Sequence, residues 1–110
     1  MDGTFDGLLS LDVLEHIKPE HEQRFLTNAL ASLVSDCVAI IGMPSLNSQQ
    51  YASPLSKAGH VNCKHQDDLR ALLARYFKRV FMFSMNDEIV HTGHPAMAHY
   101  HIALCCGKLA

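Results

Sequence analysis

The sequence predicts an α/β fold, with helices packed on a mixed four-stranded sheet, and three observations support this. Short apolar segments recur at 5–11, 37–44, 79–85 and 97–106. A helical pattern follows each of the first two segments, which gives the strand–helix–strand order typical of parallel strands. The link between the last two segments contains no helix, so we expect the last strand to run antiparallel to a neighbour. The length of 110 residues fits one domain spanning 1–110.

The first two strand segments predict a three-layer arrangement. Residues 5–11 are apolar apart from Asp6, Gly7 and Ser10, and residues 37–44 are apolar throughout. Continuous apolar strands are typical of parallel sheets that helices cover on both faces. We therefore expect both strands to be buried on both sides.

Two helices are predicted between the strands. The first begins near Pro19, carries an apolar stripe and ends at Asp36; its stripe is Phe25, Leu26, Ala29, Leu30, Leu33 and Val34. The second is capped by Gln66 or Asp67 and has the stripe Leu69, Leu72, Leu73 and Tyr76. Residues 45–66 are expected to form a long loop, and loops of that length usually carry function.

Composition excludes several classes of protein. Nine basic and eleven acidic residues give a net charge of −2, which provides no electrostatic surface for nucleic acid or an anionic membrane. No apolar run approaches 18 residues, and no amino-terminal targeting signal is evident. The four cysteines, at 37, 63, 105 and 106, have no C-x-x-C spacing and are interpreted as free thiols in a reducing compartment. We expect a soluble cytoplasmic protein.

Polar groups follow the first strand at Asp12, Glu15 and His16. The carboxyl ends of strands in open α/β sheets are where ligands bind. The 45–66 loop follows the second strand, so its His60 and Asn62 belong to the same rim. His60 there is either a general base toward a substrate hydroxyl or amine, or part of a turn fixed by local hydrogen bonds.

The residues 5–17, FDGLLSLDVLEHI, resemble the segment around the fourth strand of class I S-adenosylmethionine-dependent methyltransferases. Ile40–Pro44 looks like the fifth strand of that family, and Ser53-Pro54 with Gly59-His60-Val61-Asn62 is similar to the loop that follows it. The resemblance implies a Rossmann-like fold. In the family's strand labels the sheet order here would be 4-5-7-6.

The same resemblance implies roles for residues. Asp12, Val13, Leu14, Glu15 and His16 would border S-adenosylmethionine, and Pro44, Ser45, His60 and Asn62 would lie on the substrate side. The methyl acceptor is not identified by the sequence, and His60 is the candidate catalytic residue.

A divalent metal is bound near this position in some similar proteins. The matching residues here would be Asp12, Glu15 and His16, with His60 or His65 completing the set, and carboxylates with imidazoles suit such ions. We favour the simpler interpretation, in which Glu15 pairs locally, His16 packs at the strand end, and no metal binds.

The chain also departs from the family. It contains no G-x-G-x-x-G loop and no acidic residue at the end of a preceding strand. The resemblance therefore implies the carboxyl-terminal half of a methyltransferase domain, inactive alone. Its first strand would be an exposed edge, which predicts a homodimer joined through residues 5–11 into one eight-stranded sheet. The alternatives are a non-catalytic homo-oligomeric or interaction module, and a split enzyme completed by a second chain.

The remaining reactive side chains are assigned structural roles. His99 and His101 would share one face of the last strand, in a segment that also holds His91 and His94. Cys63 lacks a positioned base and is expected to be inert. Ser10 and Ser45 match no hydrolase pattern.

Overall fold

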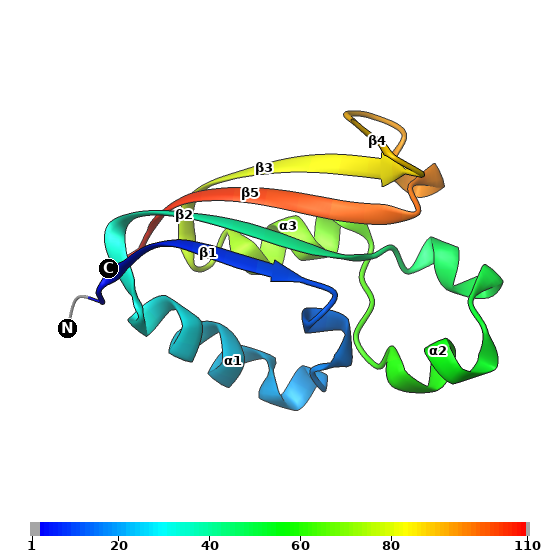
Figure 1. Cartoon of the computed structure of the whole chain (residues 1–110), viewed down its shortest axis with the longest axis horizontal. Coiled ribbons are helices and arrows are strands. Elements are labelled where there is room, and N and C mark those ends of the chain that lie inside the picture. The colour runs from blue at the N-terminus through cyan, green and yellow to red at the C-terminus, as the bar shows by residue number, and fades with distance from the viewer. Residues whose placement is uncertain (1–2, 110) are drawn as a thin grey trace.

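A computed structural model describes residues 3–109, which form one sheet with helices packed against it (Figure 1). The strands are β1 (Phe5–Leu11), β2 (Leu33–Pro44), β3 (Phe77–Asn86), β4 (Ile89–His91) and β5 (Tyr100–Lys108). The α-helices are α1 (Pro19–Ala31), α2 (Pro54–Gly59) and α3 (Gln66–Leu73). Three short 3-10 helices complete the fold: η1 (Leu14–His16), η2 (Asn47–Tyr51) and η3 (Pro95–Met97).

The strand order confirms the expected arrangement and adds one strand. The sheet runs β1-β2-β5-β3-β4, so its first four members follow the order 4-5-7-6. β1 is parallel to β2, and β5 is antiparallel to both β2 and β3, as expected for the last strand. The fifth strand, β4, lies in the link between the third and fourth predicted strands. It pairs with the end of β3 through a tight turn at Asp87, whose φ of 51° is left-handed.

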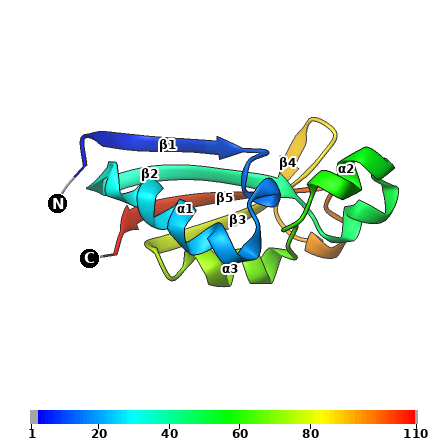
Figure 2. The same cartoon turned by 90° about the horizontal axis from the view of Figure 1, so that it is seen from below.

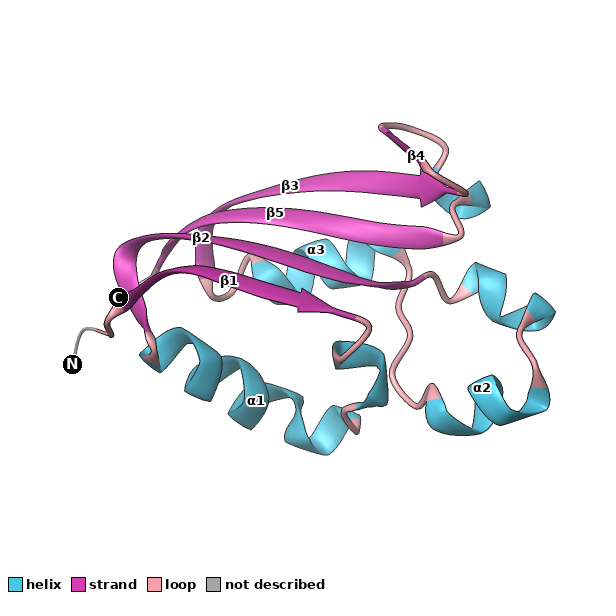
Figure 3. Ribbon diagram, viewed as in Figure 1, coloured by secondary structure: helices cyan, strands magenta, loops and turns pink. Residues whose placement is uncertain are grey.

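The α/β class is confirmed, but the expected burial of strands on both faces is wrong. α1 and α3 lie on the same side of the sheet, as Figure 2 shows, and the described residues form two layers. Burial therefore alternates along the strands: Ala39 and Ile41 of β2 are buried, whereas Val38 and Ile40 are exposed. Continuous apolar composition indicated two covered faces, yet only one face has helices against it (Figure 3).

The core lies between that covered face and the helices. Leu26 and Leu30 of α1 and Leu69 and Leu73 of α3 belong to one buried cluster with β2 side chains. Each such side chain contributes roughly 1.5–3 kcal/mol through removal from water. This cluster fixes the position of the carboxyl ends of β1 and β2, where the polar residues gather.

The first helix is shorter than its apolar pattern predicted. α1 ends at Ala31, and Ser32 turns the chain through hydrogen bonds to Ala29. Leu33 and Val34, expected on the helix stripe, instead begin β2, and Leu33 pairs with Phe5. Pairing with the start of β1 outweighs the helical spacing, because it satisfies backbone groups on both strands.

The expected loop at 45–66 is partly helical. η2 and α2 lie within it, and Ser53 caps α2 by accepting a hydrogen bond from the Ser56 amide, with Pro54 in the first turn. α3 follows with His65, not Gln66 or Asp67, at its N-cap. β3 extends beyond the predicted 79–85 at both ends. β5 begins and ends later than the predicted 97–106, and Met97 belongs to η3. Among residues 3–109 no helix is both long and apolar enough to span a membrane.

Candidate functional site

The site begins where β1 ends, at Asp12. This residue has a left-handed φ of 59°, a conformation that Asp tolerates better than most residues. Its amide donates to the Gly42 carbonyl at 3.2 Å and to the Tyr100 hydroxyl at 3.2 Å. Tyr100 lies so close to Gly42 that a Cβ there would come within 2.6 Å of its ring. A glycine in β2 therefore allows Tyr100 to hold the turn that leaves β1.

The next turn, η1, aims two functional groups in different directions. Leu14 is fully buried and anchors η1 to the core. Glu15 follows it into the interior and is only 1% exposed, whereas the His16 side chain is 49% exposed. A single 3-10 turn thus sets a buried carboxylate beside a half-exposed imidazole.

His60 reaches this turn from the segment that follows α2. The Asn62 amide donates to the Glu15 carbonyl at 3.0 Å, which ties the two segments together. The Asn62 side chain donates to Glu22 at 2.6 Å, and Lys64 pairs with Glu22 at 2.9 Å. These partly buried polar contacts hold the segment that follows α2, and with it His60, against η1.

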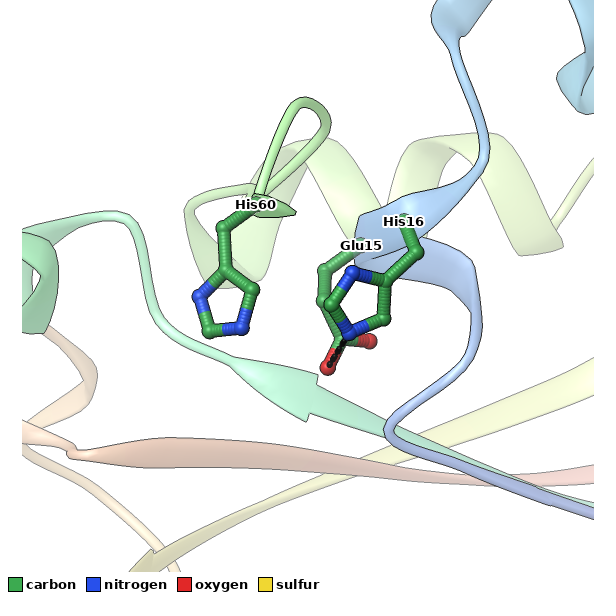
Figure 4. A group of neighbouring side chains, drawn as sticks. All are labelled: Glu15, His16 and His60. Carbon is green, nitrogen blue, oxygen red and sulfur yellow. Dashed lines mark ion pairs between the residues drawn. The ribbon is translucent and has the colours of Figure 1, made fainter. Parts of the chain in front are cut away.

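Glu15, His16 and His60 form a compact group (Figure 4). One ligand atom from each lies within 4.8 Å of the other two. His16 Nε2 is 3.8 Å from Glu15 Oε2, and the imidazole rings meet edge to face with centroids 5.0 Å apart. Two imidazoles and one carboxylate therefore converge from two segments of the chain.

Both imidazoles are oriented by contacts on their other ring nitrogen. His16 Nδ1 lies 2.8 Å from the Gly59 carbonyl, and His60 Nδ1 lies 2.9 Å from Gln49 Oε1. A carbonyl oxygen only accepts, so Nδ1 donates in each contact when the ring is neutral. The Nε2 atom of each ring then carries a lone pair that is free to accept a proton or bind a cation.

The carboxylate of Glu15 is poorly solvated. Its Oε1 atom is buried and has no hydrogen-bond partner among the described residues. Burial raises the pKa of Glu15, and the charge of Asp12 raises it further, although its own backbone and the two imidazoles oppose this. A buried carboxylate with a raised pKa and an unused oxygen is suited to hold a proton or to bind a cation.

The structure brings together only part of the predicted site. His60, rather than His65, joins Glu15 and His16; His65 is exposed at the start of α3. Asp12 is exposed at the strand end and lies outside the group. Leu14 is an apolar anchor and Val13 is exposed at 39%. The expected local pairing of Glu15 is limited to His16 at 3.8 Å, which leaves one oxygen unpartnered.

The predicted substrate-side residues have structural contacts as well. Ser45 is buried and its hydroxyl donates to the Ala98 carbonyl, while Pro44 is half-buried at the end of β2. Asn62 is engaged with Glu22 and Lys64. Beyond Ser45, an open cavity of about 560 Å³ lies between η2 and η3, within the range of small-molecule sites. Its lining carries no Asp, Glu, Lys or Arg: Asn47, Ser48, Gln50, Tyr51, Ala96, Met97, Ala98 and His99.

Sequence reasoning missed Gln49 and Tyr100, which position His60 and Asp12. Gln49 lies in the run Asn47-Ser48-Gln49-Gln50, where no pattern in the sequence distinguishes it from the adjacent Gln50. Tyr100 could have been found only from the register that sets it opposite Pro44 and beside Gly42.

The other reactive groups behave largely as expected. Burial, assisted by the Glu15 charge, raises the pKa of Cys63 to about 11, which fits an inert thiol. The cysteines are free: Cys37 and Cys105 are buried, while Cys106 and Cys63 are partly buried. His101 is buried on β5, but His99 precedes that strand and is exposed, so the two do not share a face.

Comparison with known proteins identifies the fold. No protein-family model and no curated protein matches the sequence. A solved structure does match: the crystal structure of a SAM-dependent methyltransferase from Archaeoglobus fulgidus, with a TM-score of 0.67 and 15% sequence identity. The chain has a methyltransferase-like fold. The match covers 96% of this chain and 60% of the archaeal one, so the chain spans less than two thirds of that protein's length.

Proposed function

We propose that this chain supplies the carboxyl-terminal part of an S-adenosylmethionine-dependent methyl-transfer site. The observation that carries the proposal is the coincidence of fold and site: a methyltransferase-like sheet has its polar group at the carboxyl ends of β1 and β2. Ligands of open α/β sheets bind at this position. The two alternatives remain a non-catalytic interaction module and a split enzyme completed by a second chain.

The residues present fit one wall of a cofactor site. Asp12 is exposed and the neighbouring Val13 is 39% exposed, so a carboxylate and apolar surface face outward at the strand end. Such a surface suits a cofactor that has hydroxyl and amino groups beside an apolar ring. The 110 residues include no glycine-rich loop of the G-x-G-x-x-G type. The surface around Asp12 would therefore form only one wall of the cofactor site.

The side chains supply positioning and proton transfer. S-adenosylmethionine, when bound, supplies a methyl group on a positively charged sulfur. While no cation is bound, His60 Nε2 would accept the proton of an acceptor hydroxyl or amine, because its Nδ1 is engaged by Gln49. A cation bound to Nε2 would occupy that lone pair, so the two roles exclude each other. The uncharged cavity between η2 and η3 would take part of the acceptor. Because one wall alone holds the cofactor weakly, the chain by itself is expected to lack transfer activity.

Amide chemical-shift mapping with S-adenosylmethionine tests this proposal. Millimolar cofactor should shift amides of residues 11–17, and Asp12→Ala should abolish those shifts. Asp6→Ala, which removes an exposed acid from the other end of β1, is the matched control and should leave them unchanged. Shifts confined to other regions, or shifts that survive Asp12→Ala, would contradict the proposal.

A specific observation favours a second property of this site. We infer that Glu15, His16 and His60 bind a divalent cation. The Oε1 atom of Glu15 is buried without a partner, and the two imidazoles present their Nε2 atoms to the same place. Two imidazoles and one carboxylate suit Zn²⁺ with an open fourth position, or Mn²⁺ with additional waters. The sequence alone favoured a metal-free site, and the convergence of these three side chains is the observation that favours a cation.

Titration calorimetry with ZnCl₂ and MnCl₂ tests the cation site. His60→Ala should weaken binding by at least tenfold, since it removes one of three ligands. His65→Ala removes an exposed imidazole from the nearby α3 N-cap and should leave the affinity unchanged. Equal affinities in the two variants would show that the metal binds elsewhere.

A further inference from the structure

The face of the sheet that points away from α1 and α3 is apolar and uncovered (Figure 2). The register aligns its side chains in two rows across four strands. One row is Leu9, Ile40, Leu104 and Phe81, and the next is Leu11, Gly42, Ile102 and Phe83. We call these two rows, with the adjacent Val38 and Cys106, the open face.

The open face exposes a continuous set of large apolar side chains. Leu9 is 68% exposed, Phe81 49%, Leu11 44%, Val38 44% and Ile40 38%. Neither row contains a charged side chain, but Arg79 lies opposite Cys106 on the same face and borders the patch. Exposed apolar surface of this continuity marks an interaction site.

Its size matches what a dimer requires. Aromatic side chains offer roughly 150–250 Å² each and aliphatic ones somewhat less, so the five exposed fractions correspond to on the order of 400–500 Å² of surface. A standard interface buries about 800 Å² on each partner. About 65% of a homodimer interface is apolar, which is close to 520 Å² per partner. The open face alone therefore accounts for the apolar part of a standard homodimer.

We propose that a second copy of this chain packs on the open face, so that two sheets stack face to face. Sheets stack in this way about 10 Å apart, with their strands inclined by about 30°. A two-fold axis would let each open face cover the other, which is the commonest closed assembly of identical chains. The occupant is an uncharged, self-complementary apolar surface, and a second copy provides one.

Pairing along the free edge of β1 does not meet the same need. Edge pairing exchanges backbone hydrogen bonds with water for bonds between strands, and the net gain of each is small. It would also leave the open face of each copy exposed to solvent. The position of the exposed side chains thus favours stacking over the edge-to-edge dimer first expected from residues 5–11.

Sedimentation equilibrium of the full chain, from 1 to about 100 µM, tests the proposal. The wild type should be dimeric, and Ile40→Lys and Phe81→Lys should each be monomeric, because each buries a charge in the stacked interface. Leu55→Lys is the matched control: Leu55 is 86% exposed on α2, outside the open face, and this variant should remain dimeric. Far-ultraviolet circular dichroism verifies that every variant is folded.

Amide hydrogen exchange separates the remaining outcomes. In a stacked dimer, the β1 amides that do not bond to β2 should exchange as fast as in the Ile40→Lys monomer. A dimer that survives both lysine substitutions and protects those amides would be edge-paired, and would overturn the proposal. A wild type that stays monomeric at about 100 µM would also overturn it and would point to a different polypeptide as the occupant.

Discussion

The imidazole rings of His16 and His60 meet edge to face, with their centroids 5.0 Å apart and their planes inclined at 66°. The two residues come from η1 and from the end of α2, and the buried Glu15 lies beside both. Each ring is held by a contact on Nδ1, so the Nε2 atoms are left for other chemistry. This relationship is the geometric basis for the binding site that we propose at the strand end.

The first prediction concerns Glu15→Gln in metal-free, chelator-treated solution. Burial raises the pKa of Glu15 in the folded state. Protonated Glu15 therefore makes its full contribution to stability below the ordinary carboxyl pKa, and this contribution is lost as pH rises through the raised folded-state pKa. The variant should therefore be more stable than wild type at pH 7–8, by on the order of 1 kcal/mol. The difference should vanish near pH 4. Urea unfolding at several pH values measures it.

When metal is present, Glu15→Gln should be less stable than the wild type, which is the opposite of the metal-free result. Saturating Zn²⁺ should stabilise the wild type and not Glu15→Gln, because a ligand that binds the folded state adds stability by mass action. A variant that remains the more stable of the two in saturating Zn²⁺ would count against the cation site.

A second prediction concerns Gln49. Gln49→Ala removes the contact that orients His60 and should weaken Zn²⁺ or Mn²⁺ binding about tenfold, while Gln49→Glu should restore or strengthen it. Gln50→Ala removes the adjacent exposed carboxamide and serves as the control. Nitrogen-15 shifts of the His60 ring report the tautomer directly. Unchanged ring shifts in Gln49→Ala would show that Gln49 does not position His60.

The sequence predicted the order of the strands but not which of their faces are covered. The parallel first pair and the antiparallel last strand follow from the succession of apolar segments and from the missing helix before β5, which are local features. The full order 4-5-7-6 came from the resemblance to the methyltransferase family. Coverage depends on where α1 and α3 pack, and identical apolar composition on both faces of β2 carries no such information. The apolar Leu33 and Val34 fit a helix equally well, until pairing with β1 is known.

The candidate site was predictable in part for a similar reason. Asp12, Glu15 and His16 follow one strand closely, so their proximity was visible in the sequence. The choice between His60 and His65 depended on α2, which ends just before His60, and on the Asn62 bond to Glu15. Neither contact has a sequence signature.

A third prediction concerns the buried His101. Neither ring nitrogen makes a hydrogen bond of ordinary geometry within residues 3–109. Burial lowers its pKa, as does the charge of His65, although the Lys64 backbone opposes this. Because the pKa of His101 is lower in the folded state, the unfolded chain binds a proton at a higher pH than the folded chain does. The free energy of unfolding therefore falls as pH drops through and below the ordinary histidine pKa of about 6.5. His101→Leu should remove on the order of 1 kcal/mol of the stability lost between pH 7.5 and pH 5.

His99→Leu is the control for that measurement, because His99 is exposed next to the same strand. Its stability should depend on pH as the wild type's does. If His101→Leu loses as much stability on acidification as His99→Leu, the acid sensitivity arises from other groups.

The last prediction compares two glycines on either side of the β1 irregularity. A Cβ on Gly3 would lie 2.0 Å from the Ser32 carbonyl carbon, and the Gly3 amide donates to Leu33 at 3.2 Å. A Cβ on Gly7 would meet nothing closer than the Val38 oxygen at 3.9 Å. Gly3→Ala must therefore displace backbone and should cost about 1–3 kcal/mol. Gly7→Ala should be neutral or slightly stabilising, since glycine weakens a strand interior. Urea unfolding of both variants measures the difference, and equal stabilities would show that the chain before β1 does not pack against Ser32 in solution.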